Sequence, residues 1–131
     1  VAPTNVNFPI IGTTQMNVAW TPGDGTYSIV LAKNNSAPFL APANGESYNA
    51  NAQYGLGDVI GDAYVVYVGI ESNITVTGLT EGTAYYFAVY TFNGIDNGTV
   101  YLDIPALGNE TTKVPAPEPL GQDRVISFRN S

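Results

Sequence analysis

Carboxylates are the strongest candidates for acid–base chemistry in this 131-residue sequence, because the chain contains neither histidine nor cysteine. Without histidine, the commonest general base, the serine–histidine pair and imidazole metal ligands are absent. Without cysteine, disulfides and thiolate metal sites are excluded. Five aspartates lie mostly in predicted turns, which attract aspartate for backbone reasons: Asp24, Asp58, Asp62, Asp96 and Asp103. A glycosidase needs two carboxylates that face each other across a cleft, so we predict that the chain is not an enzyme.

Asp58 and Asp62 are the candidates for a calcium site, because they flank the short segment Val59-Ile60-Gly61. Oxygen ligands on loops suit a hard cation such as Ca²⁺. The spacing of the two aspartates does not match an EF-hand loop, and turn chemistry accounts for both. We therefore favour turn roles for them and predict no metal site and no cofactor.

Tyrosines are the remaining candidates for a binding surface. Tyr86 and Tyr90 fall on the opposite face of a predicted strand from Tyr85, and Tyr64 and Tyr67 fall on different faces of another strand. A planar row of aromatic rings could stack on sugar rings. The competing interpretation is cross-strand aromatic packing on a half-buried sheet face, and it is the one that we favour.

The composition excludes several classes of protein. Its length suits a single domain, and 44% hydrophobic residues with 11% charged residues argue against a disordered chain. The net charge is −7 with four basic residues, whereas a nucleic-acid binder needs a basic stripe. An anionic membrane surface is disfavoured for the same reason. No apolar run of membrane-spanning length is visible, so we expect neither nucleic-acid binding nor membrane insertion.

Side chains alternate with the two-residue period of β-strands at several places, and no helical period is present. The clearest strands are residues 14–21, 27–33 and 79–93, and the third contains the turn signal Glu81-Gly82. The residues predicted to form the core share faces of these strands or of a weaker one: Met16, Val18, Trp20, Ile29, Leu31, Ile74, Val76, Leu79, Tyr85, Phe87 and Val89.

Weaker strand signals complete the pattern, and they lie at residues 4–8, 64–68, 73–77, 99–102 and 109–113. The last two can form one strand that Pro105 interrupts. Residues 34–62 break the pattern with prolines and glycines among aromatic and aliphatic side chains, so we expect a long loop that packs down on the sheets. About seven strands without helices predict an all-β, immunoglobulin-like antiparallel sandwich.

Three motifs together resemble the fibronectin type III domain. They are Met-x-Val-x-Trp at residues 16–20, Leu-Thr-x-Gly-Thr-x-Tyr-Tyr-Phe-Ala-Val at 79–89, and Asn-Glu-Thr-Thr at 109–112. The resemblance implies the same sandwich, with Tyr85 at the tyrosine corner, where its hydroxyl bonds to the backbone just upstream.

Further details look like the version of this domain that is repeated in secreted and surface proteins of Bacteroidetes-type bacteria, such as Trp-Thr-x-Gly-Asp-Gly at residues 20–25. The long segment before Tyr64 departs from the shorter animal domains. No Arg-Gly-Asp tripeptide is present, so the resemblance does not imply integrin-type adhesion.

The sequence divides into three predicted regions: a sandwich over residues 1–113, a proline-rich linker over 114–122, and a terminal strand over 123–131. The apolar residues of the terminal strand are Val125, Ile126 and Phe128. This strand resembles residues 3–8, which suggests the first strand of a following repeat. Two alternatives stay open, namely a strand that pairs with a neighbouring copy and a disordered end.

Two functional hypotheses follow. The first is a non-catalytic structural or adhesive module of a secreted or cell-surface protein, acting in a linear array of tandem repeats or strand-exchanged subunits. Its partners would be neighbouring domains or identical subunits, bound through the terminal strand. The alternative is a carbohydrate- or protein-binding accessory module of a secreted multi-domain enzyme, with a surface glycan or protein as ligand. Because the sequence begins at Val1 without methionine, we expect a mature form after cleavage or an excised fragment.

Overall fold

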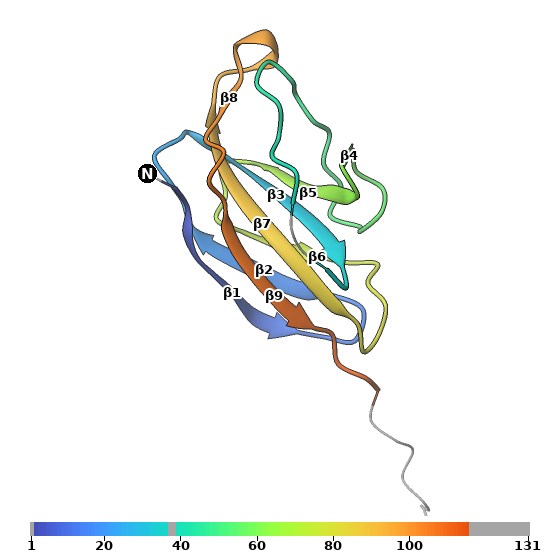
Figure 1. Cartoon of the computed structure of the whole chain (residues 1–131). Helices are drawn as coiled ribbons and strands as arrows, with labels where there is room; N and C mark the ends of the chain where they lie inside the picture. The colour runs from blue at the N-terminus through green and yellow to red at the C-terminus, as the bar shows by residue number, and fades with distance from the viewer. Residues whose placement is uncertain (1, 37–38, 116–131) are drawn as a thin grey trace, which may run out of the picture.

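The computed structural model describes residues 2–36 and 39–115, which form nine strands and one short 3₁₀ helix (Figure 1). The strands are β1 (Thr4–Ile11), β2 (Met16–Thr21), β3 (Tyr27–Asn34), β4 (Val59–Ile60), β5 (Ala63–Gly69), β6 (Asn73–Val76), β7 (Ala84–Asn93), β8 (Val100–Tyr101) and β9 (Ala106–Thr111), and the helix is η1 (Asp96–Gly98). A helix of the length and apolarity needed to cross a membrane is absent from these described residues.

The strands form two antiparallel sheets, which confirms the predicted all-β, immunoglobulin-like sandwich. One sheet has the order β1-β2-β6, and the other has the order β4-β5-β3-β7-β8, with β9 also paired to β7. The described residues contain nine strands where the sequence predicts about seven. The difference arises because β4 has only two residues, too few for an alternating pattern, and because the last strand is split into β8 and β9 around Pro105.

The longest strand, β7, is central to the six-stranded sheet. It pairs with β3 in an unbroken register from Tyr27 opposite Phe92 to Asn34 opposite Tyr85. On its other side it pairs with β9 and then with β8. Aromatic and β-branched residues dominate β7, as is typical of a strand with packed neighbours. Because successive side chains of a strand point to opposite faces, β7 contributes residues to two apolar clusters, one on each face of the sheet.

The inter-sheet core lies between the two sheets. Most of the predicted core residues are buried in it: Met16, Val18, Trp20, Val76, Leu79, Tyr85, Phe87 and Val89. The indole Nε1–H of Trp20 donates to the Ser28 hydroxyl at 3.2 Å, which satisfies the polar atom of that buried ring. The backbone N–H of Thr80 donates to the Tyr85 hydroxyl at 2.8 Å, which is the geometry of a tyrosine corner. Ile74 packs against the core but is half-buried, because β6 is a four-residue edge strand.

Ile29 and Leu31 are fully buried, but they lie outside the inter-sheet core. The side chains of β3 that face the other sheet are Val30 and Ala32. Because successive side chains of a strand point to opposite faces, Ile29 and Leu31 point to the outer face of the six-stranded sheet. The predicted core thus mixes residues of two separate apolar layers, since both faces of this central strand are covered.

The outer cluster is the second apolar layer, on the outer face of the six-stranded sheet. Its buried members are Ile29, Leu31, Ile60, Ala63, Val65, Ala88, Tyr90, Phe92 and Tyr101. Phe39, Ala41 and Tyr48 from the long segment between β3 and β5 pack against it. This segment runs in teal and green beside β3 and β5 in Figure 1. The prediction that it packs down on the sheets is confirmed.

The edge strand β1 runs three residues beyond its predicted end at residue 8 and includes Pro9. Its pairing with β2 shifts register twice, between Thr4 and Asn7 and between Asn7 and Ile10. A proline is tolerated here because an edge strand has one side that needs no ladder donor. The register shifts are irregularities of the kind that blunt a sheet edge.

Candidate functional site

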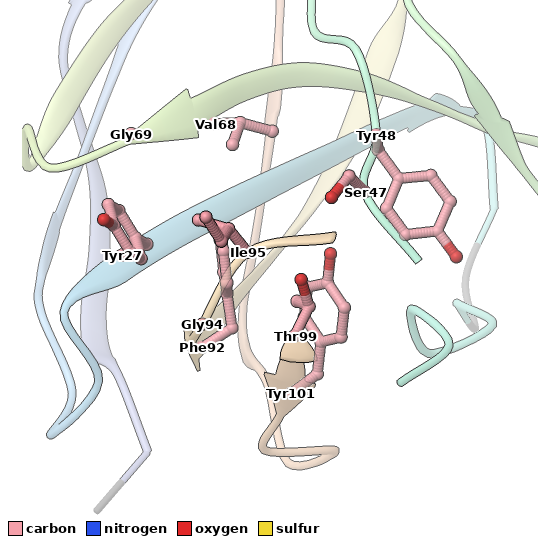
Figure 2. A pocket seen from close by; sticks show the side chains of 10 residues that line it. All are labelled: Tyr27, Ser47, Tyr48, Val68, Gly69, Phe92, Gly94, Ile95, Thr99 and Tyr101. Atoms are coloured by element: carbon pink, nitrogen blue, oxygen red, sulfur yellow. The ribbon is translucent and has the colours of Figure 1, made fainter. Parts of the chain in front are cut away.

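A pocket of about 300 Å³ opens at the end of the outer cluster where β7 ends (Figure 2). We call it the aromatic pocket, and the residues that line it are Tyr27, Ser47, Tyr48, Val68, Gly69, Phe92, Gly94, Ile95, Thr99 and Tyr101. Its volume is at the lower end of the range for small-molecule sites, and such sites are usually apolar with a few placed polar groups. The lining of this pocket fits that description.

Strand pairing positions the aromatic wall of the pocket. Tyr27 begins β3 and lies opposite Phe92 near the end of β7, so their rings stack with centroids 5.2 Å apart and planes at 26°. Phe92 also lies opposite Tyr101 of β8, with ring centroids 4.9 Å apart. The sheet register therefore brings together three rings from three strands.

The long segment supplies the opposite wall, and hydrogen bonds to the β8 region hold it there. The backbone N–H of Tyr101 donates to Asn44 Oδ1 at 2.8 Å, and the Tyr101 hydroxyl donates to the Glu46 carbonyl at 2.9 Å. The Gly45 N–H donates to the Thr99 carbonyl at 2.8 Å. These bonds place the Tyr48 ring 6.1 Å from the Tyr101 ring.

Thr99 carries the unusual polar group of the site. Its side chain is 2% exposed, and its hydroxyl has no hydrogen-bond partner among the described residues. An unpaired buried hydroxyl costs about 1–3 kcal/mol, so such groups are rare in folded proteins. Figure 2 shows Thr99 beside Tyr101 at the end of the pocket below Ser47. The Thr99 hydroxyl is therefore a donor and acceptor held at the pocket without a partner.

The hydroxyl of Tyr101 stays neutral at physiological pH. Burial, and then repulsion from Tyr48 and Glu46, raises the pKa of Tyr101 to about 12. Its proton is engaged by the Glu46 carbonyl, so its remaining capacity is as an acceptor. No charged side chain is among the residues that line the pocket. The charged residues at its rim are acidic. Asp96 bonds to the rim residue Ser47, and Glu46 directly precedes Ser47 in the chain.

The calcium candidates Asp58 and Asp62 each have a partner within the protein. Asp58 Oδ2 accepts the backbone N–H of Asn49 at 2.7 Å, which fixes a turn of the long segment. Asp62 pairs with the nearly buried Lys33 ammonium at 2.9 Å, and this hydrogen bond and charge lower the pKa of Asp62. Across residues 2–36 and 39–115, no three histidine, cysteine, aspartate or glutamate side chains assemble into a metal-binding group.

The four tyrosines considered from the sequence do not form an exposed row. Tyr90 is buried in the outer cluster, and Tyr64, Tyr67 and Tyr86 are partly buried. The Tyr67 ring lies 5.7 Å from the Trp20 ring, and its hydroxyl accepts the Glu71 N–H at 2.6 Å. These tyrosines belong to the packing of the sandwich.

The aromatic pocket contains residues that sequence reasoning does not select, notably Tyr48, Thr99 and Tyr101. They come from an irregular segment and from the far side of a turn, so no periodic pattern connects them. The available signal was the presence of tyrosines in stretches too irregular to be strands. The predicted inter-unit residues Val125, Ile126 and Phe128 lie outside the described residues.

Comparison with known proteins agrees with the geometry. A computationally redesigned β-sandwich protein is similar in structure with a TM-score of 0.59 and 18% identity, over 92% of this chain and 97% of that one. The FN5 domain of Drosophila Lar is similar with a TM-score of 0.53 and 16% identity, over 87% of this chain and 97% of that one. A structure of titin domains is similar with a TM-score of 0.54 and 18% identity, over 86% of this chain and 32% of that one. At these identities the similarity shows the fold alone.

Sequence comparison identifies the family to which the chain belongs. No curated protein matches the chain. The model of the fibronectin type III domain matches residues 1–101 of the 131. Because that match spans well over half of the chain, and because the described strands form the corresponding sandwich with its tyrosine corner, the chain belongs to the fibronectin type III family.

Proposed function

We propose that the chain is a non-catalytic structural or adhesive module of an extracellular or cell-surface protein, of the kind repeated in surface proteins of Bacteroidetes-type bacteria. The observation that carries the proposal is the use made of the carboxylates. Asp58, Asp62 and Asp96 each bond to a nearby backbone or side-chain group, so they serve the fold. Fibronectin type III domains are commonly structural modules of multidomain proteins, which fits this use.

The sequence after the sandwich supports an arrangement in linear arrays. Residues 123–131 contain Val125, Ile126 and Phe128, and leaving such side chains in water forfeits roughly 1.5–3 kcal/mol each. A sheet edge of a neighbouring unit can accept a strand through main-chain hydrogen bonds. Of the two edges of the small sheet, β6 is short but regular up to Thr77, where the long segment pairs with it, whereas β1 carries two register shifts. The regular edge is the better acceptor.

Sedimentation and circular dichroism test this proposal. The full chain is compared with a chain that lacks residues 122–131 and with a chain in which Val125, Ile126 and Phe128 are replaced by aspartate. A matched control replaces Gln122 and Asn130 by alanine. We expect concentration-dependent association of the full chain and the control, and monomers with an intact sandwich for the other two. Association that is unchanged by the deletion contradicts the proposal.

A second candidate function is a ligand-binding accessory module, and the aromatic pocket is the observation that favours it. Its lining combines strand residues of the sandwich with Ser47 and Tyr48 of the long segment and with Thr99 and Tyr101 of the β8 region. Binding of the labelled chain to an array of immobilised glycans tests this function. The variant Ser47→Leu, at an exposed position on the rim, should reduce binding by filling the pocket.

A further inference from the structure

We propose that the aromatic pocket binds one uncharged pyranose ring, with the Thr99 hydroxyl as its buried hydrogen-bond partner. The inference rests on the second candidate function and specifies the ligand and the site. Three independent features support it: the arrangement of the rings, the unpaired hydroxyl, and the absence of charge in the lining.

The rings provide flat apolar surface of the size of a sugar. Tyr27 and Phe92 stack on each other, while the Tyr48 and Tyr101 rings are tilted by 58°, so the lining presents rings in different orientations. The face of an aromatic ring carries partial negative charge. The C–H groups of a pyranose carry partial positive charge and can lie on such a face. A pocket of about 300 Å³ holds one such ring and little more.

The hydroxyls provide the polar half of the recognition. Thr99 Oγ1 has no partner among the described residues and can both donate and accept. The Tyr101 hydroxyl donates to the Glu46 carbonyl and so presents an acceptor. A sugar carries several hydroxyls that both donate and accept, so it can offer a partner to each of these groups. An apolar ligand would leave the Thr99 hydroxyl unpaired, and that makes it a poorer occupant.

Charge selects among polar ligands. An anionic ligand would meet the acidic rim, since Glu46 and Asp96 lie beside Ser47. A quaternary ammonium cation would suit the aromatic faces and the acidic rim, but its methyl groups offer the Thr99 hydroxyl no hydrogen bond. A neutral ring with several hydroxyls can bond to Thr99 and meets no like charge at the rim.

Chemical-shift mapping tests the inference with the full chain. The probes are methyl β-D-glucopyranoside, methyl β-D-galactopyranoside and methyl α-D-mannopyranoside, with glucuronate as the anion and choline as the cation. We expect at least one neutral glycoside to shift the amides of Tyr48, Gly69, Gly94 and Thr99. Thr99→Val keeps the shape of the side chain and should weaken that binding at least fivefold. Thr111→Val, exposed at the other end of the sheet, should bind like the unmodified chain.

The outcomes separate this inference from the function on which it rests. If Thr99→Val does not fold, as judged by amide dispersion, Ser47→Leu replaces it and should abolish the shifts. If the Thr99→Val variant binds the glycan array as strongly as the unmodified chain, the result supports a ligand-binding module but overturns this site. Choline shifting the same amides when no glycoside does overturns the sugar assignment. Silence of every glycoside at tens of millimolar overturns the inference.

Discussion

The inter-sheet core and the outer cluster are two apolar layers on opposite faces of the same sheet, yet they are closed in different ways. The inter-sheet core has a hydrogen-bonded sheet on each side. The outer cluster has a sheet on one side and, on the other, the long segment, which has β4 as its short strand. Side-chain-to-backbone bonds, such as those of Asn44 and Tyr101, hold parts of that cover in place.

The difference explains where the pocket lies. A sheet presents side chains at fixed spacings, so two sheets can interdigitate to a dense layer. A loop cannot repeat that spacing, so its cover leaves gaps, and the aromatic pocket is one of them. The strands determine stability, and the irregular cover creates the candidate binding site.

The largest expected effect is in the inter-sheet core. Trp20→Ala removes a ring that is 5% exposed and leaves the Ser28 hydroxyl without its donor. We expect a loss of about 3–5 kcal/mol in the free energy of unfolding, measured by urea denaturation. A loss below about 1 kcal/mol would show that this ring is not central to the layer.

The next largest effect is the loss of stability expected from a substitution in the outer cluster, for comparison with the loss expected in the inter-sheet core. Leu31→Ala should cost about 2–5 kcal/mol, because Leu31 is fully buried under the long segment. Ile70→Ala is the control, since Ile70 is exposed, and it should change stability by less than about 0.5 kcal/mol. Equal effects of the two substitutions would indicate that the long segment leaves the outer face open to water.

A smaller effect concerns one hydrogen bond of the inter-sheet side. Tyr85→Phe keeps the buried ring and removes the acceptor of the Thr80 N–H. We expect a loss of about 1 kcal/mol, measured by thermal and urea unfolding. A neutral result would mean that water replaces the hydroxyl at the exposed turn without cost.

The smallest effect is expected from the matching tyrosine-to-phenylalanine substitution in the outer cluster, and this change in stability depends on pH. Tyr101→Phe removes the bond to the Glu46 carbonyl, with an expected loss of about 0.5–1 kcal/mol at neutral pH. The pKa of Tyr101 is about 12 in the folded chain, above the value of about 10 for an unfolded tyrosine. The stability that the neutral hydroxyl contributes is therefore complete below pH 10 and is lost as the pH rises toward 12.

The stability difference between Tyr101→Phe and the unmodified chain should thus fall from about pH 10 and change sign before about pH 12, because each unit of pKa difference is worth about 1.4 kcal/mol and phenylalanine does not titrate. Unfolding by urea at a series of pH values measures it. A difference that stays constant over this range would contradict the assignment of the raised pKa to the folded state.

Much of the inter-sheet core could be predicted because it follows local rules. Met16, Val18 and Trp20 share a face by the two-residue period, and Leu79 with Tyr85 marks the corner before β7. The candidate site could not be predicted in this way. Its rings come from Tyr27, Tyr48, Phe92 and Tyr101, which meet through strand register and through the path of an irregular segment.

The sequence by itself determined that the chain is an all-β sandwich of this family, since alternation, turn residues and the tyrosine-corner motif are local properties. Only the tertiary structure decided which face of β3 belongs to which layer. Alternation separates Ile29 and Leu31 from Val30 and Ala32 but does not say what covers either set. That choice depends on contacts between residues far apart in the chain, and no local pattern encodes the packing that places the unpaired hydroxyl of Thr99 at the pocket.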